Sequence, residues 1–426
     1  MLHLLSSPWI ALSVLTGIAA SARIMSGSWL HPSAFPGLVW SVFIFLALVV
    51  APEYEVGGFG VWIIVALNTA TYIGAFLVPG RVDLSGATRM TAPLPISRWI
   101  GWVVAFSSLA LVGAVLFGAI SLSDNGQSAS FSGLVALGHV VSVARYSGVK
   151  EPAIVRALWM WVFPAAVLGG ITFVLGRNRF QKVLSLSPFV PAFAFSLVET
   201  TRGGFIIAMC CWLGAFLATK VCSTGGNYRP FNLRALVVTG LLALVVCSVF
   251  VGFDAIRVFT PGHMLEMEAN YPRMKAYFVG SLCFFDRWMD QEQNSENLTL
   301  GTETFRSLAE FAGLRTWQIN PVLMLEGGGE TNIPTAFRGL IQDFTFPGAL
   351  FICLVFGYTS GVAFEKTKQG QSSQLSLLAA YYSLYLFSPI IALTAYNGPI
   401  LGWISVAFLL RSRTRIVCLE HFRQCT

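Results

Sequence analysis

Charged residues are scarce in this chain. Only 11% of its 426 residues are Asp, Glu, Lys or Arg, and 55% are hydrophobic, whereas about 25% of the residues in soluble domains are charged. This composition excludes an ordinary soluble domain. Apolar runs of 16 to 23 residues recur along the chain, close to the roughly 20 residues with which a helix crosses a bilayer. Because a backbone in lipid must satisfy its own hydrogen bonds, these runs predict helices.

Several functional signatures are also missing. The five histidines have no zinc-site spacing, and no glycine-rich nucleotide motif occurs, so nothing in the sequence requires a metal or a nucleotide cofactor. No acidic or basic residue falls in the middle of a predicted span, which disfavours proton pumps, ion-coupled transporters and voltage sensors. The first 20 residues lack the basic start of a secretory signal, and we expect them to form the first span.

We predict an all-α integral membrane protein with about 11 transmembrane helices in one polytopic domain, residues 1–426. The expected spans lie near 4–22, 34–51, 58–79, 99–121, 154–175, 183–198, 203–219, 235–252, 347–364, 374–394 and 398–410.

The loops between these spans alternate in charge. One set of connectors, together with the C-terminal tail, holds 16 of the 27 basic residues but only three of the 20 acidic ones. Short basic loops stay in the cytoplasm. We therefore predict an external N-terminus and a cytoplasmic C-terminus, which leaves the positive charge of the chain at the membrane and makes nucleic acid an unsuitable partner.

Two external segments are too long to be simple connectors. Residues 122–153 contain an amphipathic stretch that predicts a helix at the membrane interface. Residues 253–346 form a large loop in which prolines, Pro272 and Pro334 among them, interrupt helical periodicity. We expect this loop to be a cap of short helices resting on the membrane domain.

The tightest external connector is the hairpin that contains Glu199, Arg202, Gly203 and Gly204. It places an acid and an arginine at one tip, and its glycines allow the backbone to approach a ligand closely. The alternative is an ordinary interfacial anchor, in which Arg202 extends its head group to water and Glu199 neutralises it.

The large loop is rich in arginine, including Arg257, Arg273 and Arg338. Arginine binds phosphate in a bidentate manner, so these residues are candidates for an anion site. Arg257 directly follows the eighth span, and Arg273 lies in a stretch that predicts a helix beginning after Pro272. Solvation at the surface or pairing with external acids is the alternative for each of them.

The stretch of residues 327–357 is the most informative. After a glycine run, Thr331 and Asn332 are candidate caps for a helix with Pro334 near its first turn. Arg338 lies four residues before Gln342 on the same helix face, next to Asp343. A capped helix N-terminus beside arginines suits an anion. Alternatively, this helix only positions the ninth span, which would begin at Pro347-Gly348.

Part of this stretch, TNIPTAFRGLIQDFTFPG, resembles the TxxYTAFRxxxxDFGxxG region of bacterial oligosaccharide repeat unit polymerases, also called O-antigen polymerases. Further similarity lies in the span HPSAFPGLVWSVFIFLALVV, in ARYSG at 144–148, and in the TRGG hairpin. The resemblance implies a GT-C-like, metal-independent membrane glycosyltransferase without a cofactor. Such an enzyme of the bacterial inner membrane, facing the periplasm, moves a growing glycan from undecaprenyl pyrophosphate to a hydroxyl of a lipid-linked repeat unit.

The product would be O-antigen of lipopolysaccharide, capsule or exopolysaccharide, and a chain-length regulator would be a protein partner. We expect developing negative charge on the pyrophosphate to be stabilised by arginines, and a carboxylate to accept the proton of the attacking hydroxyl. The candidate catalytic residues are Arg202, Arg257, Arg273, Arg338, Asp343 and Glu199. The candidate substrate-binding residues are Arg145, Tyr146, Tyr277, His139, His263 and Asn332.

Two other functions remain open at this point. An O-antigen ligase would pass the glycan to lipid A core, and ligases typically use a histidine in the large loop, a place that His263 could take. A transporter of polysaccharide or lipid-linked oligosaccharide belongs to another class. It would be expected to have polar groups within its spans and an internal repeat, and the sequence shows neither.

Overall fold

The computed structural model describes a bundle of helices. It covers residues 7–78, 96–124, 152–199, 202–226, 228, 267–292, 298–316, 322–325 and 330–411. Seven helical segments in these parts are long and apolar enough to cross a membrane, so the chain is a helical membrane protein, as its composition predicts. They are α2 (Pro8–Ser26), α4 (Gly58–Phe76), α5 (Ile96–Asp124), α7 with α8 (Ala153–Trp159 and Val162–Leu175), α9 with α10 (Arg179–Leu184 and Phe189–Glu199), α11 (Gly203–Thr224) and α15 (Ala336–Lys368).

Three shorter helices coincide with further predicted spans. They are α3 (Phe35–Val50), α16 (Leu375–Phe387) and α17 (Asn397–Leu410). The predicted span at 235–252 lies outside the described residues, so the number of eleven spans stays a prediction.

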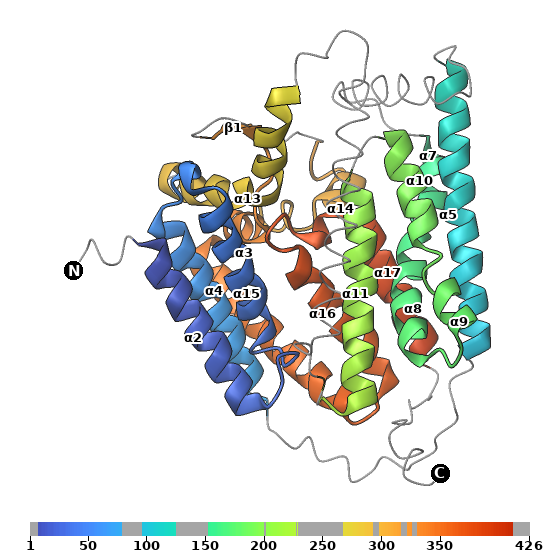
Figure 1. Ribbon diagram of the computed structural model, residues 1–426, viewed down its shortest axis with the longest axis horizontal. Helices are drawn as coiled ribbons and strands as arrows, with labels where there is room; N and C mark the ends of the chain where they lie inside the picture. The colour runs from blue at the N-terminus through green and yellow to red at the C-terminus, as the bar shows by residue number, and fades with distance from the viewer. Residues whose placement is uncertain are drawn as a thin grey trace.

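The helices form two groups that pack side by side (Figure 1). In one group α4 packs against α15, α2 and α3. In the other, α11 packs against α8 and α16, while α5 packs against α8 and α10. Helix α16 also contacts α15 and so joins the two groups.

The crossing of α4 and α15 is unusually close. A Cβ atom added at Gly74 would overlap the carbonyl oxygen of Leu354, and one added at Gly357 would overlap the carbonyl oxygen of Thr71. In lipid, helix association depends on van der Waals packing, and small residues at the interface allow the backbones to approach. These two glycines are therefore required for the packing of the first group.

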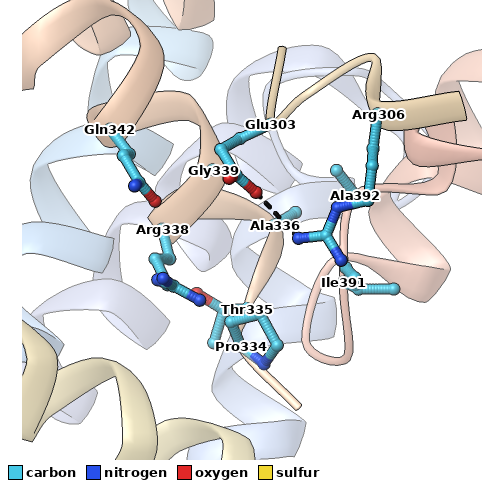
Figure 2. Close-up of a pocket in the computed structure, with 10 residues that line it drawn as sticks. All are labelled: Glu303, Arg306, Pro334, Thr335, Ala336, Arg338, Gly339, Gln342, Ile391 and Ala392. Carbon is cyan, nitrogen blue, oxygen red and sulfur yellow. Dashed lines mark hydrogen bonds and ion pairs between the residues drawn. The ribbon is translucent and has the colours of Figure 1, made fainter. Parts of the chain in front are cut away.

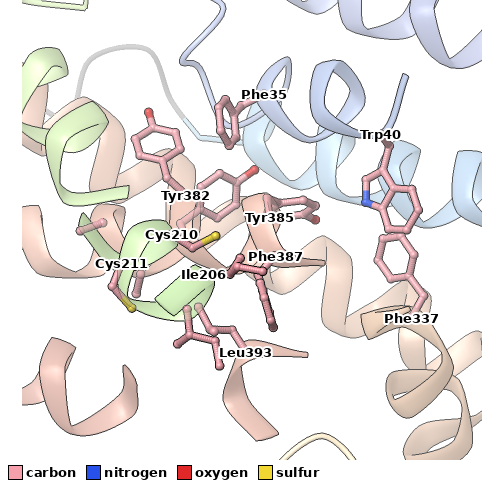
Figure 3. Packing of buried hydrophobic residues seen from close by; sticks show 14 of the residues in the cluster. Phe35, Trp40, Ile206, Cys210, Cys211, Phe337, Tyr382, Tyr385, Phe387 and Leu393 are labelled. Carbon is pink, nitrogen blue, oxygen red and sulfur yellow. The ribbon is translucent and has the colours of Figure 1, made fainter. Parts of the chain in front are cut away.

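The core between the groups is built of aromatic side chains from α16 and its neighbours (Figure 3). Tyr381 donates a hydrogen bond to the carbonyl oxygen of Pro32 at 2.7 Å, Tyr382 donates one to Leu30, and Tyr385 shares one with Thr71 at 2.7 Å. A buried hydroxyl without such a partner would be costly. The tyrosines thus hold the segment before α3, together with α4, against α16.

The two ends of the bundle carry different residues and elements. Helix α9 and the C-terminal ends of α2 and α11 lie at one end, and this end carries Arg23, Lys182, Lys220 and Lys368. The other end holds α13 (Met267–Glu292), α14 (Arg306–Phe311) and the hairpin of β1 (Leu323–Met324) and β2 (Glu330–Thr331) (Figure 1). We call these the basic end and the cap end.

The cap differs from the predicted one. Its longest helix, α13, has 26 residues rather than being short, and it continues through Pro272, where we expected a helix to begin. Proline removes one backbone hydrogen bond in a helix, and contacts of α13 with α3 and α4 offset this loss. Of the predicted interfacial segment 122–153, only the two ends are described, where α5 continues to Asp124 and α7 begins at Ala153.

The predicted span 374–394 is also too long. Helix α16 ends at Phe387, and an irregular segment with the short 3-10 helix η4 (Leu393–Ala395) follows it. Pro389 has no backbone N–H to continue the helix. Its neighbour Ser388 accepts a hydrogen bond from the backbone N–H of Ala336 at 2.9 Å, which ties the end of α16 to the start of α15.

Candidate functional site

Helix α13 is fixed to the membrane domain through Asp286. The two carboxylate oxygens of Asp286 accept hydrogen bonds from the backbone N–H groups of Gly57 at 2.7 Å and Gly60 at 2.8 Å. These N–H groups belong to the start of α4 and have no partner within that helix. Burial raises the pKa of Asp286, and the bonds from Gly60 and Gly57 partly offset this effect. A second anchor is the ion pair between Lys275 and Glu53.

The opposite face of α13 carries a stripe of aromatic rings. Tyr277, Phe284 and Trp288 are spaced by seven and four residues, so they lie on one side of the helix, whereas Lys275 and Asp286 lie on the other. Two arginines from distant parts of the chain cover this stripe. The guanidinium carbon of Arg202 is 5.3 Å from the ring centre of Tyr277, and that of Arg338 is 5.4 Å from Phe284 and 5.5 Å from Trp288.

Both arginines are only 8% exposed. A guanidinium over an aromatic face is stabilised by about 0.5 to 2 kcal/mol, more where water is excluded. Because a helix rises about 1.5 Å per residue, the seven residues from Tyr277 to Phe284 separate the two contacts by about 10 Å. The aromatic stripe of α13 thus holds two positive charges along one line at the cap end.

Arg202 reaches α13 from the predicted hairpin. Helix α10 ends at Glu199, and Arg202 is the N-cap residue of α11. A Cβ atom added at Gly204 would lie 3.0 Å from the Trp159 ring, whereas one added at Gly203 would meet nothing within 4 Å. Gly204 therefore packs against Trp159. Gly203 has open space beside its backbone, which we expected at both glycines so that a ligand could approach.

Arg338 lies in the first turn of α15, although this helix begins later than predicted. The N-cap residue is Thr335, and not Thr331 or Asn332 as we expected from the glycine run before them. Thr331 belongs to β2, and its hydroxyl accepts a hydrogen bond from the backbone N–H of Ile333 at 3.3 Å. Pairing in the hairpin therefore takes the place of a helix cap at this residue.

The predicted face of Arg338 and Gln342 is present and lines a small pocket (Figure 2). This pocket has about 260 Å³ of empty space, including solvent at its mouth. The lining consists of Glu303, Arg306, Pro334, Thr335, Ala336, Arg338, Gly339, Gln342, Ile391 and Ala392. Within the described part of the chain, Gln342 Oε1 and Thr335 Oγ1 are buried without a hydrogen-bond partner, so both are available to a polar ligand.

A second charged group borders this pocket from the turn before α14. Glu303 forms ion pairs with Arg306, at 2.7 Å, and with Arg315. Burial raises the pKa of Glu303, but the hydrogen bond and charge of Arg306, followed by those of Arg315, outweigh this effect and leave the pKa below its usual range. Glu303 is therefore held as an anion between two guanidinium groups.

Asp343 has a different environment from the one we expected. It is fully buried, and it accepts hydrogen bonds from the hydroxyl of Thr299 at 2.5 Å and from the backbone N–H groups of Glu303 at 3.0 Å and Thr304 at 2.7 Å. A general base must reach the proton that it removes. This geometry argues against Asp343 as the base and assigns it to supporting the turn that carries Glu303.

The structure thus brings together Arg202, Tyr277 and Arg338 from the predicted set. Glu199 lies nearby at the end of α10, and Asn332 is partly buried between β2 and α15. Arg273 is on α13 one turn before Tyr277, but its side chain lies outside the described residues, as do Arg257, Arg145, Tyr146, His139 and His263 entirely.

Four residues of the site were not among the predicted ones. Phe284 and Trp288 could have been found, because with Tyr277 they form a helical stripe in the sequence. Glu303 and Arg306 have no comparable signal, since their importance comes from contacts with α15. In the residues that the structure describes, no group of three or more His, Cys, Asp or Glu side chains is arranged to hold a metal ion.

These features offer sites for anions rather than for a metal. Two shielded arginines, Arg202 and Arg338, can bind phosphate groups through charge-assisted hydrogen bonds, and the Thr335 hydroxyl can donate a further hydrogen bond. Comparisons with models of known protein families, with curated proteins and with solved structures find nothing that matches this chain.

Proposed function

We propose that this protein polymerises lipid-linked oligosaccharide repeat units. In the proposed reaction, a hydroxyl of an incoming repeat unit attacks the anomeric carbon of a growing glycan. The bond from this carbon to the pyrophosphate of the polyprenyl carrier breaks, and the pyrophosphate leaves with the electron pair. The observation that carries the proposal is the pair of buried arginines, Arg202 and Arg338, on one face of α13.

The surroundings of these arginines suit a pyrophosphate leaving group. Negative charge develops on the leaving oxygen, and preorganised donors in a sheltered site stabilise it more effectively than water does. The aromatic rings of α13 hold the guanidinium planes, while bidentate donation to phosphate oxygens uses their edges. The two contacts on α13, about 10 Å apart along the helix, can engage two parts of one extended substrate.

Glu199 is the remaining carboxylate of the predicted pair, and we propose it as the base that accepts the proton of the attacking hydroxyl. It ends α10 three residues before Arg202, at the tip of the same hairpin.

The motif resemblance is supported by one backbone feature. Thr345 has φ 61° and ψ 172° within α15, a region that is almost exclusive to glycine. The motif of the polymerase family has glycine at this place. The bend at Thr345 therefore has backbone dihedral angles that glycine adopts without strain.

The test uses Arg202→Ala and Arg338→Ala in a deletion strain complemented with each variant. We expect both to abolish long-chain glycan on gels of surface polysaccharide, at unchanged protein abundance. Arg202→Lys and Arg338→Lys keep the positive charge but lose the bidentate geometry of the guanidinium group. We expect these variants to make strongly shortened glycan chains. Arg179→Ala is the matched control, because Arg179 is exposed at the basic end on α9; its ladder should be normal.

Normal ladders from both alanine variants would contradict the proposal. The deletion strain separates the other functions. Accumulation of a single-repeat lipid-linked product indicates a polymerase, whereas free long polymer that is not attached to lipid A core indicates a ligase. Repeat units retained on the cytoplasmic face indicate a transporter.

A further inference from the structure

The segment of residues 298–316 has its polar side turned inward. Its four charged residues, Glu303, Arg306, Glu310 and Arg315, are all partly buried. Its exposed residues are Leu298, Leu300, Phe305, Leu308, Phe311, Ala312, Gly313, Leu314 and Thr316. This arrangement is the reverse of the one found on water-exposed surfaces.

The exposed apolar side chains are large and prominent. Phe311 is 89% exposed, Leu300 77% and Leu314 74%. Helix α14 ends at Phe311, and Gly313, with the left-handed φ of 71°, follows two residues later. The backbone N–H of Leu314 donates a hydrogen bond to the carbonyl oxygen of Ala309 at 2.9 Å. This tight C-cap places Phe311 and Leu314 on either side of the turn.

The depth of this segment follows from the helix to which it is bonded. Ser307 donates a hydrogen bond to the carbonyl oxygen of Ala395 at 2.6 Å, and Asn397 donates one to the carbonyl oxygen of Ser307 at 3.3 Å. Asn397 is the first residue of α17, which has 14 residues and is followed by Arg411 at the basic end. Such a helix rises about 21 Å, whereas the hydrocarbon layer is about 30 Å thick.

If Leu410 reaches the boundary of the layer at the basic end, Asn397 lies below the boundary at the cap end. The segment bonded to it then lies at the depth of the acyl chains. Figure 1 agrees with this placement, since α14 is level with the upper end of α11 and lies below the upper ends of α5 and α13.

The polar groups of the segment fit this depth. Irregular backbone within a membrane must be satisfied by protein, and Thr394 donates to the carbonyl oxygen of Thr304 at 2.8 Å. Charges within a membrane are paired and face the protein, as Glu303 does with Arg306 and Arg315.

We propose that residues 298–316 insert into the lipid leaflet at the cap end, with Phe311 and Leu314 among the acyl chains. This inference rests on the membrane embedding alone and does not depend on the polymerase reaction. It implies that Arg306, the first residue of α14, lines the pocket from a segment whose other face contacts lipid.

The test uses single cysteines labelled with the fluorophore NBD in nanodiscs. Phe311→Cys and Leu314→Cys are compared with Glu330→Cys, because Glu330 is exposed on the hairpin at the cap end. The background replaces Cys247, Cys418 and Cys425 by alanine; the five cysteines that the structure describes are buried. Lipids with a nitroxide on the acyl chain report contact with the hydrocarbon layer, and iodide reports contact with water.

We expect lipid nitroxides to quench the label at 311 and 314 strongly and iodide to leave it bright, with the reverse order at 330. Quenching of positions 311 and 314 by iodide would show that the surface faces water and would overturn the proposal. Protection from both quenchers would show that protein covers the surface, a partner or a second copy of the chain, and would equally overturn it.

Discussion

The arginines at the cap end fall into two kinds according to what their guanidinium groups contact. Arg202 and Arg338 lie over aromatic rings, which stabilise the cation without neutralising it. Arg306 and Arg315 share the carboxylate of Glu303, so their charge is largely compensated. The second kind supports the turn that Asp343 also holds, and the first kind is the pair on which the proposed function rests.

A prediction at this scale concerns Glu303. Because its pKa is lowered in the folded protein, its contribution to stability is present above the unfolded pKa of about 4.3 and is lost as the pH falls below that value. Glu303→Gln should lower the free energy of unfolding by about 3 kcal/mol at pH 7, since it leaves two buried guanidinium groups without their carboxylate.

The measurement is thermal unfolding in nanodiscs at pH 7 and near pH 3. The variant should lose less stability than the wild type on acidification. Glu365→Gln is the matched control, because Glu365 forms only a 3.7 Å pair with an exposed lysine, Lys368, and such pairs contribute about 0 to 1 kcal/mol. Equal stability of the Glu303 variant and the wild type at pH 7 would contradict the assigned role.

Among the elements, α15 connects the pocket to the membrane domain. Its first turns carry Arg338 and Gln342 and line the pocket, and the rest crosses the bundle beside α4. The kink at Thr345 separates these two parts, and Pro347 follows it as the sequence predicts for the opening of the span. The position of Arg338 therefore depends on a backbone conformation that threonine adopts only with strain.

Thr345→Gly should relieve this strain. The gain of about 1 to 3 kcal/mol exceeds the roughly 1 kcal/mol that glycine costs by its greater freedom in the unfolded chain, so we expect a net stabilisation of about 1 kcal/mol. Unfolding midpoints in detergent or nanodiscs measure this change. Thr359→Gly, in the regular and exposed part of the same helix, should instead destabilise the protein by up to about 1 kcal/mol. A destabilised Thr345→Gly variant would show that the strain is absent.

The whole molecule separates its charge between two ends. The basic end carries the short arginine- and lysine-rich turns, and the cap end carries α13, α14 and the hairpin (Figure 1). Positive charge in short loops retains them in the cytoplasm, so we propose that the basic end is cytoplasmic and the cap end periplasmic.

Reporter fusions test this orientation. Green fluorescent protein fused after the C-terminal tail should fluoresce, and alkaline phosphatase inserted after Asp124, at the end of α5, should be active. Reversing the charge of the turn at Arg177, Arg179 and Lys182 should weaken the retention of this end in the cytoplasm. Active phosphatase at the C-terminal tail would contradict the orientation.

Local patterns in the sequence were sufficient for the membrane class and for most helix positions. The predicted span 34–51 corresponds to α3, 58–79 to α4 and 398–410 to α17, each within three residues at either end. Such agreement is expected because hydrophobicity acts over one segment at a time. The predictions failed where a segment depends on distant partners: α13 continues through Pro272, and Thr331 pairs in a hairpin instead of capping a helix.

The sequence by itself determined that this chain lies in a membrane, and it predicted that the loops alternate in charge and that the large loop is rich in arginine. Only the tertiary structure decided which of them meet: Arg202 and Arg338 over the aromatic stripe of α13, and Glu303 between two other arginines. The physical reason is one of range. Burial in lipid is decided along each helix, whereas the pairing of buried charges and rings depends on packing between helices that lie far apart in the chain.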